Sequence, residues 1–126
     1  MKQILLVAGA GALGALSRWG LTSVCRGVFG ATFPYGTLAA NVIGCLVLGF
    51  VAQSSLQTSF VPDAIKIPMT VGFLGALTTF STFSYETVKL FTDQSWGLAI
   101  ANLSANLFIG IAATAGGIAM ARSLGS

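Results

Sequence analysis

Hydroxyl side chains are concentrated within one apolar stretch of the sequence. Residues 77–84 contain five of them, interrupted by Phe80 and Phe83, and Gly72 and Gly75 lie just upstream. Hydroxyl groups both donate and accept hydrogen bonds, so a cluster of them competes with the helical bonds of its own backbone. Irregular polar backbone at membrane depth persists only where protein buries it or where it lines a wet path. We therefore interpret this stretch as a break in a membrane-spanning helix and expect it to line an ion path.

The composition is that of an integral membrane protein. The 126 residues are 55% hydrophobic and only 7% charged, with a mean hydropathy of +0.88, whereas roughly 25% of residues are charged in an ordinary soluble domain. Charge-free runs, together with an apolar N-terminal run, can each hold the helix of about 20 residues that crosses hydrocarbon. Residues 1–126 are therefore predicted to form one all-α domain with four transmembrane helices, of which the third is broken: about 3–24, 36–54, 67–90 and 96–121.

The first two predicted helices each carry one residue, Arg18 and Asn41, whose polar side chain is unusual inside a membrane. Arg18 interrupts the first helix, where a charge either snorkels outward beside Trp19 or holds a buried partner. Asn41 lies in the second helix, one turn after Thr37. Its amide either bonds to a neighbouring helix or lines the ion path. The sequence leaves both choices open.

The fourth predicted helix carries a polar stripe. Asn102, Asn106 and Thr114 recur at multiples of four residues, and Gly110 occupies the remaining position of that series. Residues four apart lie on one face of a helix. Polar contacts between helices and a permeation path both produce such a stripe, so the pattern alone does not choose between packing and permeation.

The distribution of basic residues gives almost no orientation in the membrane. In a four-helix arrangement, the N-terminus, the loop over 53–63 and the C-terminus share one side of the membrane. The two sides hold nearly equal numbers of basic residues: Lys2, Lys66 and Arg122 on one, and on the other Arg26 and Lys89, or three residues when Arg18 is counted there. Orientation normally follows an excess of Lys and Arg on the cytoplasmic side. A chain without that excess can insert both ways, so we predict an antiparallel, dual-topology homodimer.

The motif of the third predicted helix resembles a known family. Residues 75–86 read GALTTFSTFSYE and resemble the hallmark of the Fluc (CrcB) fluoride channels. The resemblance extends over the whole chain and includes Arg18-Trp19 and the entry to the second helix with Asn41 and Gly44. It implies an antiparallel dimer with two pores at the subunit interface. Such a dimer conducts fluoride passively out of the cytoplasm, across the inner (plasma) membrane of a microbe.

The resemblance also implies roles for individual residues. Phe80 and Phe83 correspond to the family's pore-lining phenylalanines, and Asn41 to its pore asparagine. The polar track of the fourth helix maps onto Asn106 and Thr114, although Gly110 stands where relatives often carry serine. Arg18 is expected to have a structural role at the vestibule.

A structural sodium ion is implied as well. In the family, backbone carbonyls at the break of the third helix hold it at the centre of the dimer, which corresponds here to Gly75 and Thr78. Fluoride itself is small and strongly hydrated, so its path needs closely spaced donors. Ser81 and Thr82 supply hydroxyls for this purpose, together with the Asn41 amide and that of Asn106. The partners expected are therefore a second copy of the chain, fluoride, sodium and the lipid bilayer.

The sequence lacks residues that other classes of protein require. The sequence contains no histidine, so an enzyme is not expected, and its six basic residues form no patch for nucleic acid. The alternative is a small dual-topology multidrug or cation exporter, which needs a carboxylate within the membrane. Asp63, Glu86 and Asp93 are predicted at helix ends or in loops, where Glu86 can pair with Lys89 on the surface. A non-transporting assembly subunit would leave the Phe-Ser-Thr-Phe cluster without a purpose.

Overall fold

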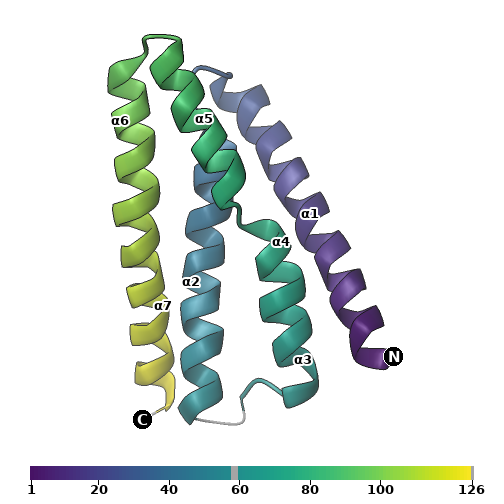
Figure 1. Ribbon diagram of the computed structural model, residues 1–126. Helices are drawn as coiled ribbons and strands as arrows, with labels where there is room; N and C mark the ends of the chain where they lie inside the picture. Colours follow the sequence, from purple (N-terminus) through teal and green to yellow (C-terminus); the bar gives the residue numbers. More distant parts are fainter. Residues whose placement is uncertain (58–59, 126) are drawn as a thin grey trace.

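The structure is a computed structural model that describes residues 1–57 and 60–125. Within these residues it is helical throughout, apart from short connections (Figure 1). The helices are α1 (Lys2–Phe29), α2 (Tyr35–Gln57), α3 (Asp63–Ile67), η1 (Pro68–Leu74), α4 (Gly75–Leu77), α5 (Phe80–Thr92), α6 (Trp96–Ser104), η2 (Ala105–Ile109) and α7 (Gly110–Gly125). They combine into four segments that are long and apolar enough to cross a membrane, which confirms the prediction of an all-helical membrane fold.

Helix ends coincide with residues that disfavour continued helix. Gly30 ends α1 with a positive φ of 83°, a conformation that glycine adopts without steric cost. Pro34 immediately precedes α2, and Pro62 precedes α3. A tight turn at Gln94, with φ of 60°, joins the third segment to the fourth. The four segments consequently run up and down, with both termini at the same end of the molecule (Figure 1).

The helix α2 lies in the middle of the bundle. It packs along α7 on one side and against α1 on the other, while α5 crosses in front of it (Figure 1). Small residues permit this packing, because a β-carbon on Gly117 would overlap the Leu46 carbonyl and one on Gly49 would overlap the carbonyl of Thr114. The buried apolar residues are few, and one cluster joins Ala40, Leu74 and Leu77, with Leu21, Val47 and Phe73 packed against them.

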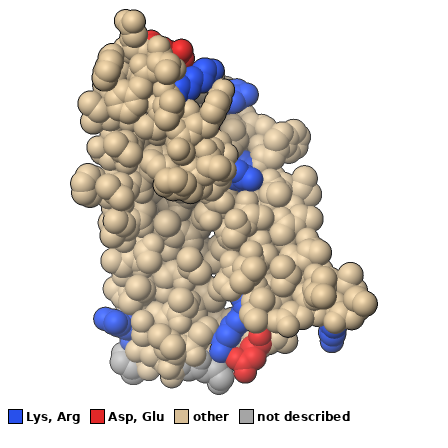
Figure 2. Space-filling model, viewed as in Figure 1, with Lys and Arg blue, Asp and Glu red and all other residues tan. Residues whose placement is uncertain are grey.

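Most of the molecular surface is apolar. On the face shown in Figure 2, charged side chains gather toward the two ends, and the band between them is mostly uncharged. The first segment, α1, has only 6% of its most apolar window buried inside the chain. Exposed apolar surface of this extent requires lipid or another protein subunit against it.

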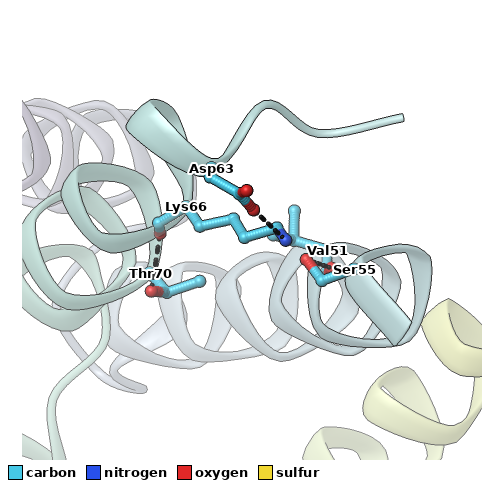
Figure 3. Close-up of polar contacts among 5 residues, drawn as sticks. All are labelled: Val51, Ser55, Asp63, Lys66 and Thr70. Carbon is cyan, nitrogen blue, oxygen red and sulfur yellow. Dashed lines mark hydrogen bonds and ion pairs between the residues drawn. The ribbon is translucent and has the colours of Figure 1, made fainter. Parts of the chain in front are cut away.

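A small polar cluster lies at the end of the molecule that carries the termini. Lys66 forms an ion pair with Asp63 in the first turn of the third segment, and the Lys66 side chain extends toward Ser55 of α2 (Figure 3). Thr70 donates to the Lys66 carbonyl, and Ser55 donates to the Val51 carbonyl. These bonds satisfy hydroxyls within their own helices, as is usual for Ser and Thr in membrane helices.

Candidate functional site

The backbone between α4 and α5 is extended at two residues. Thr78 has φ and ψ of −84° and 153°, and Thr79 has −152° and 121°. The Thr79 hydroxyl then caps α5 by accepting a hydrogen bond of 3.1 Å from the Thr82 N–H. The hydroxyl-rich stretch therefore contains the end of one helix, two extended residues and the capped beginning of another helix.

Asn41 of α2 binds both sides of the extended Thr79 residue. The Thr79 N–H donates to Asn41 Oδ1 across 2.8 Å, and Asn41 Nδ2 donates to the Thr79 carbonyl across 3.1 Å. The amide thus replaces the helical partners that Thr79 lacks, as buried backbone groups require. The alternatives left open by the sequence are compatible, because Asn41 bonds to a neighbouring segment and also lines a groove.

A chain of side-chain hydrogen bonds continues from Asn41 into the fourth segment. Asn41 Nδ2 donates to Asn106 Oδ1, and Asn106 Nδ2 donates to Asn102 Oδ1, each across 3.0 Å. Asn102 Nδ2 in turn donates to Thr87 Oγ1 across 2.9 Å, and Thr87 donates to the Phe83 carbonyl across 2.8 Å. We call Asn41, Asn106, Asn102 and Thr87 the asparagine relay. The four-residue spacing of Asn102 and Asn106 indicated part of it, whereas no spacing in the sequence indicated Thr87 or Thr79.

An open groove of about 570 Å³ lies alongside this relay. Its walls come from α2, α5, α6 and η2, and the two extended residues also line it. Phe80 and Phe83 line it with their rings in an edge-on arrangement, 5.7 Å apart between centroids and 64° between planes. Phe80 is 79% exposed, so no residue that the structure describes covers the groove at that ring. None of the other lining residues is charged: they are Asn41, Cys45, Thr78, Thr79, Ser84, Thr87, Val88, Phe91, Leu103, Asn106 and Leu107.

A second hollow, also of about 570 Å³, opens near the end of the molecule away from the termini. Its walls come from the end of α1, the connection to α2 and one face of α5. Unlike the groove it carries charged residues of both signs: Arg26, Glu86, Lys89 and Asp93. We call this hollow the charged vestibule.

The side chain of Arg18, in α1, reaches the first turn of α5. Its Nη1 donates to Thr82 Oγ1 across 3.3 Å, and its residue is partly buried, while Trp19 is 72% exposed. Of the two possibilities for this charge, the structure therefore has Arg18 with a protein partner. Thr82 also lines the charged vestibule, so the contact places Arg18 beside it.

Glu86 differs from the expectation of a surface pair. Instead of pairing with Lys89, it accepts a hydrogen bond of 2.8 Å from the Thr37 hydroxyl of α2. Its other oxygen is buried without a hydrogen-bond partner among the residues that the structure describes. Glu86 and Thr37 face each other across the packed helices, and this contact outweighs a weakly stabilising ion pair on one helix surface.

The predicted site residues fall into three places. Asn41, Thr78, Phe80, Phe83 and Asn106 line the groove together. Thr82 and Arg18 lie at the charged vestibule, and Ser81 is exposed, within 3.3 Å of the Thr79 hydroxyl. Thr114 lies apart from both hollows and donates to the Gly110 carbonyl of its own helix.

Two backbone carbonyls beside the extended residues, those of Gly75 and Thr78, lack their usual helical donors. In a continuous helix, the Gly75 carbonyl would accept from the Thr79 N–H and the Thr78 carbonyl from the Thr82 N–H. Both donors are bound elsewhere, to Asn41 Oδ1 and to the Thr79 hydroxyl. Backbone carbonyl oxygens are the type of ligand that a hard cation such as sodium prefers. Gly75 is exposed in the single chain, which leaves room for ligands from elsewhere.

The fold and the site together define a class: a small helical membrane protein whose polar residues line hollows between apolar segments. Residues 5–118 match the family model described as "CrcB-like protein, Camphor Resistance (CrcB)". The chain therefore belongs to the CrcB family, which confirms the resemblance seen in the third-segment motif.

Similar proteins agree with this family over nearly the whole chain. The "Fluoride-specific ion channel FluC" of Citrifermentans bemidjiense is 42% identical over 124 residues, covering 98% of this chain and 100% of that protein. A protein of the same name from Dehalococcoides mccartyi is 46% identical over 111 residues, with 88% and 85% covered. "Fluoride-specific ion channel FluC 2" of Symbiobacterium thermophilum is 48% identical over 107 residues, with 85% and 87% covered.

Proposed function

We propose that this protein is a fluoride-selective ion channel that conducts fluoride passively. The observation that carries the proposal is the groove in which Phe80 and Phe83 meet the hydrogen-bonded break at Thr78 and Thr79. An uncharged, mostly apolar cleft with a few polar groups, between helices that suit a membrane, provides a path for an ion without an embedded charge to trap it. The relatives named fluoride-specific ion channels supply the identity of the ion.

The chemistry of the lining suits a small, strongly hydrated anion. The ring edges of Phe80 and Phe83 are electropositive, and the two rings form an apolar wall along the proposed path. Two further hydroxyls lie outside the groove lining. Thr82 Oγ1, at the charged vestibule, accepts from Arg18 and from Thr79 and keeps its own hydrogen for an ion, and the Ser81 hydroxyl is exposed. The groups of the Asn41 amide are already bonded to protein, so fluoride reaches them only by replacing one of those bonds.

We further propose an antiparallel, dual-topology homodimer with two pores. The groove is open on one side, and exposed apolar surface surrounds it. Basic residues are nearly balanced between the two ends, as dual insertion requires. An inverted second copy would close each groove and create two equivalent paths at one interface. Thr114 would then contribute to the polar track only through this assembly, since it lies outside the groove of the single chain.

The carbonyls of Gly75 and Thr78 are proposed to hold a structural sodium ion between the two copies. Carbonyl groups without donors are costly within a membrane, and a bound cation stabilises them. The positive charge would also offset repulsion between anions in two adjacent paths. The direction of flow is out of the cytoplasm, across the inner membrane, whenever the fluoride concentration is higher inside.

Passive conduction is tested with fluoride-loaded proteoliposomes and a fluoride electrode. An anion channel moves charge, so we expect release to require a potassium ionophore that lets potassium leave with fluoride. A pH gradient should make no difference to the rate. Release that needs a pH gradient and proceeds without the ionophore would indicate proton-coupled exchange and contradict the proposal.

A further inference from the structure

The asparagine relay contains every asparagine of the chain. The sequence has three, Asn41, Asn102 and Asn106, and each is hydrogen-bonded to the next through its side chain. The donors all point the same way: from Asn41 to Asn106, from Asn106 to Asn102, and from Asn102 to Thr87. Such a one-directional series is cooperative, since each bond polarises its neighbours.

Backbone groups fix the direction of this series. Asn41 must present its oxygen to the Thr79 N–H and its nitrogen to the Thr79 carbonyl. The Asn106 nitrogen must face the Asn102 carbonyl, which it also binds across 3.0 Å. A backbone N–H only donates and a carbonyl only accepts, so no amide in the series can be turned around without loss of a bond. The orientation of Asn41 is thus coupled to residues that do not contact the break.

The two ends of the relay attach on either side of the first residues of α5, at the capping residue Thr79 and at Phe83. It begins at the backbone of Thr79 and ends where Thr87 donates to the Phe83 carbonyl. The segment enclosed between these two attachments carries Phe80 and Phe83. A displacement of either attachment changes where the two rings lie in the groove.

We propose that Asn102 and Thr87 are positioning residues that hold the break and its two phenylalanines in the geometry needed for selective fluoride conduction. Asn102 has 0% of its surface exposed, and its amide binds Thr87 on one side and Asn106 on the other. Asn102 acts through Asn106 and Asn41, whereas Thr87, which also lines the groove, acts through Asn102 and through the Phe83 carbonyl. The inference rests on the proposed function for its effect on conduction, whereas the relay itself can be tested independently.

The relay is tested by nuclear magnetic resonance on the full-length protein, labelled with 15N only in asparagine. Three side-chain amide signal pairs are expected, one for each asparagine. Thr87→Val removes the terminal hydroxyl and keeps the side-chain shape, so all three pairs should shift. Thr92→Val on the same helix is the control, because the Thr92 hydroxyl also binds a carbonyl but lies outside the relay. A shift confined to Asn102 in Thr87→Val would overturn the coupling.

Fluoride efflux from proteoliposomes tests the consequence for conduction. Leaving the buried Asn102 donor unpaired should lower the rate in Thr87→Val by about fivefold or more, while Thr92→Val keeps the wild-type rate. Thr87→Ser restores the hydroxyl and should restore the rate, which a mere packing defect would not predict. Thr87→Ala gives a smaller side chain if valine prevents assembly. If the wild-type protein conducts fluoride and Thr87→Val conducts it at the same rate, the inference is overturned. If the wild-type protein itself releases no fluoride, the proposed function is overturned instead.

Discussion

Gly44 of α2 lies directly against Thr78 at the break of the third segment, so closely that a β-carbon on Gly44 would overlap the Thr78 methyl group. Gly44→Ala should therefore displace the extended residues and destabilise the fold by about 1–3 kcal/mol, the usual cost of overpacking. Thermal unfolding in detergent, followed by circular dichroism, measures the change. Gly97→Ala is the matched control, because no atom lies within 4 Å of its added β-carbon. Equal stability of the two variants would show that the close contact between Gly44 and Thr78 does not hold the extended residues in place.

Phe80 and Phe83 should be needed for flux but not for folding. Phe80→Ile and Phe83→Ile each remove an aromatic ring that lines the groove, and with it the electropositive ring edge, while keeping an apolar side chain. We expect fluoride efflux to fall at least tenfold in each variant, with an unchanged elution volume on gel filtration. Phe108→Ile serves as the control, since Phe108 is 67% exposed and does not line the groove. Wild-type rates in both groove variants would place the rings outside the path.

Composition and hydropathy were sufficient to predict the four membrane segments, because burial in lipid imposes a long apolar run on each helix. The spacing along single helices was less informative about contacts between helices. Glu86 illustrates this: its spacing from Lys89 indicated a surface pair, yet its oxygen accepts from Thr37 of α2, 49 positions away. Such contacts depend on how the segments pack, which no local pattern encodes.

The same limit applied to the site. The hydroxyl-rich stretch and the stripe on the fourth segment were visible as sets of polar residues, since both have few places to lie in an apolar helix. The pattern could not tell that Asn102 is completely buried or that Thr87 completes its hydrogen bonding. The roles assigned to Gly75 and Thr78 came from the family motif rather than from the residues themselves.

Removal of sodium should weaken the assembly. If the Gly75 and Thr78 carbonyls hold a sodium ion, dialysis into a buffer containing N-methyl-D-glucamine as the only cation leaves those oxygens without a partner in the membrane. We expect a lower unfolding temperature and slower fluoride efflux, both restored by added sodium. Stability and efflux that do not depend on sodium would count against this site.

Dual insertion should be visible in the topology of the chain. The nearly equal basic residues at the two ends predict that a C-terminal reporter appears on both sides of the membrane in comparable amounts. Adding two lysines after Arg122 should bias the chain toward one orientation and reduce assembly of antiparallel dimers. Paired reporters active in the cytoplasm and in the periplasm measure the distribution. A single orientation of the unaltered chain would rule out the antiparallel homodimer.

Selectivity for fluoride is the central claim, and a comparison of two halides in the same vesicles tests it most directly. Proteoliposomes are loaded with equal concentrations of fluoride and chloride, and both ions are followed with selective electrodes after a potassium ionophore is added. The narrow wall formed by Phe80 and Phe83 predicts rapid fluoride release, with chloride release no faster than from protein-free vesicles. Equal rates for the two halides, or no fluoride release from well-folded protein, would contradict the account.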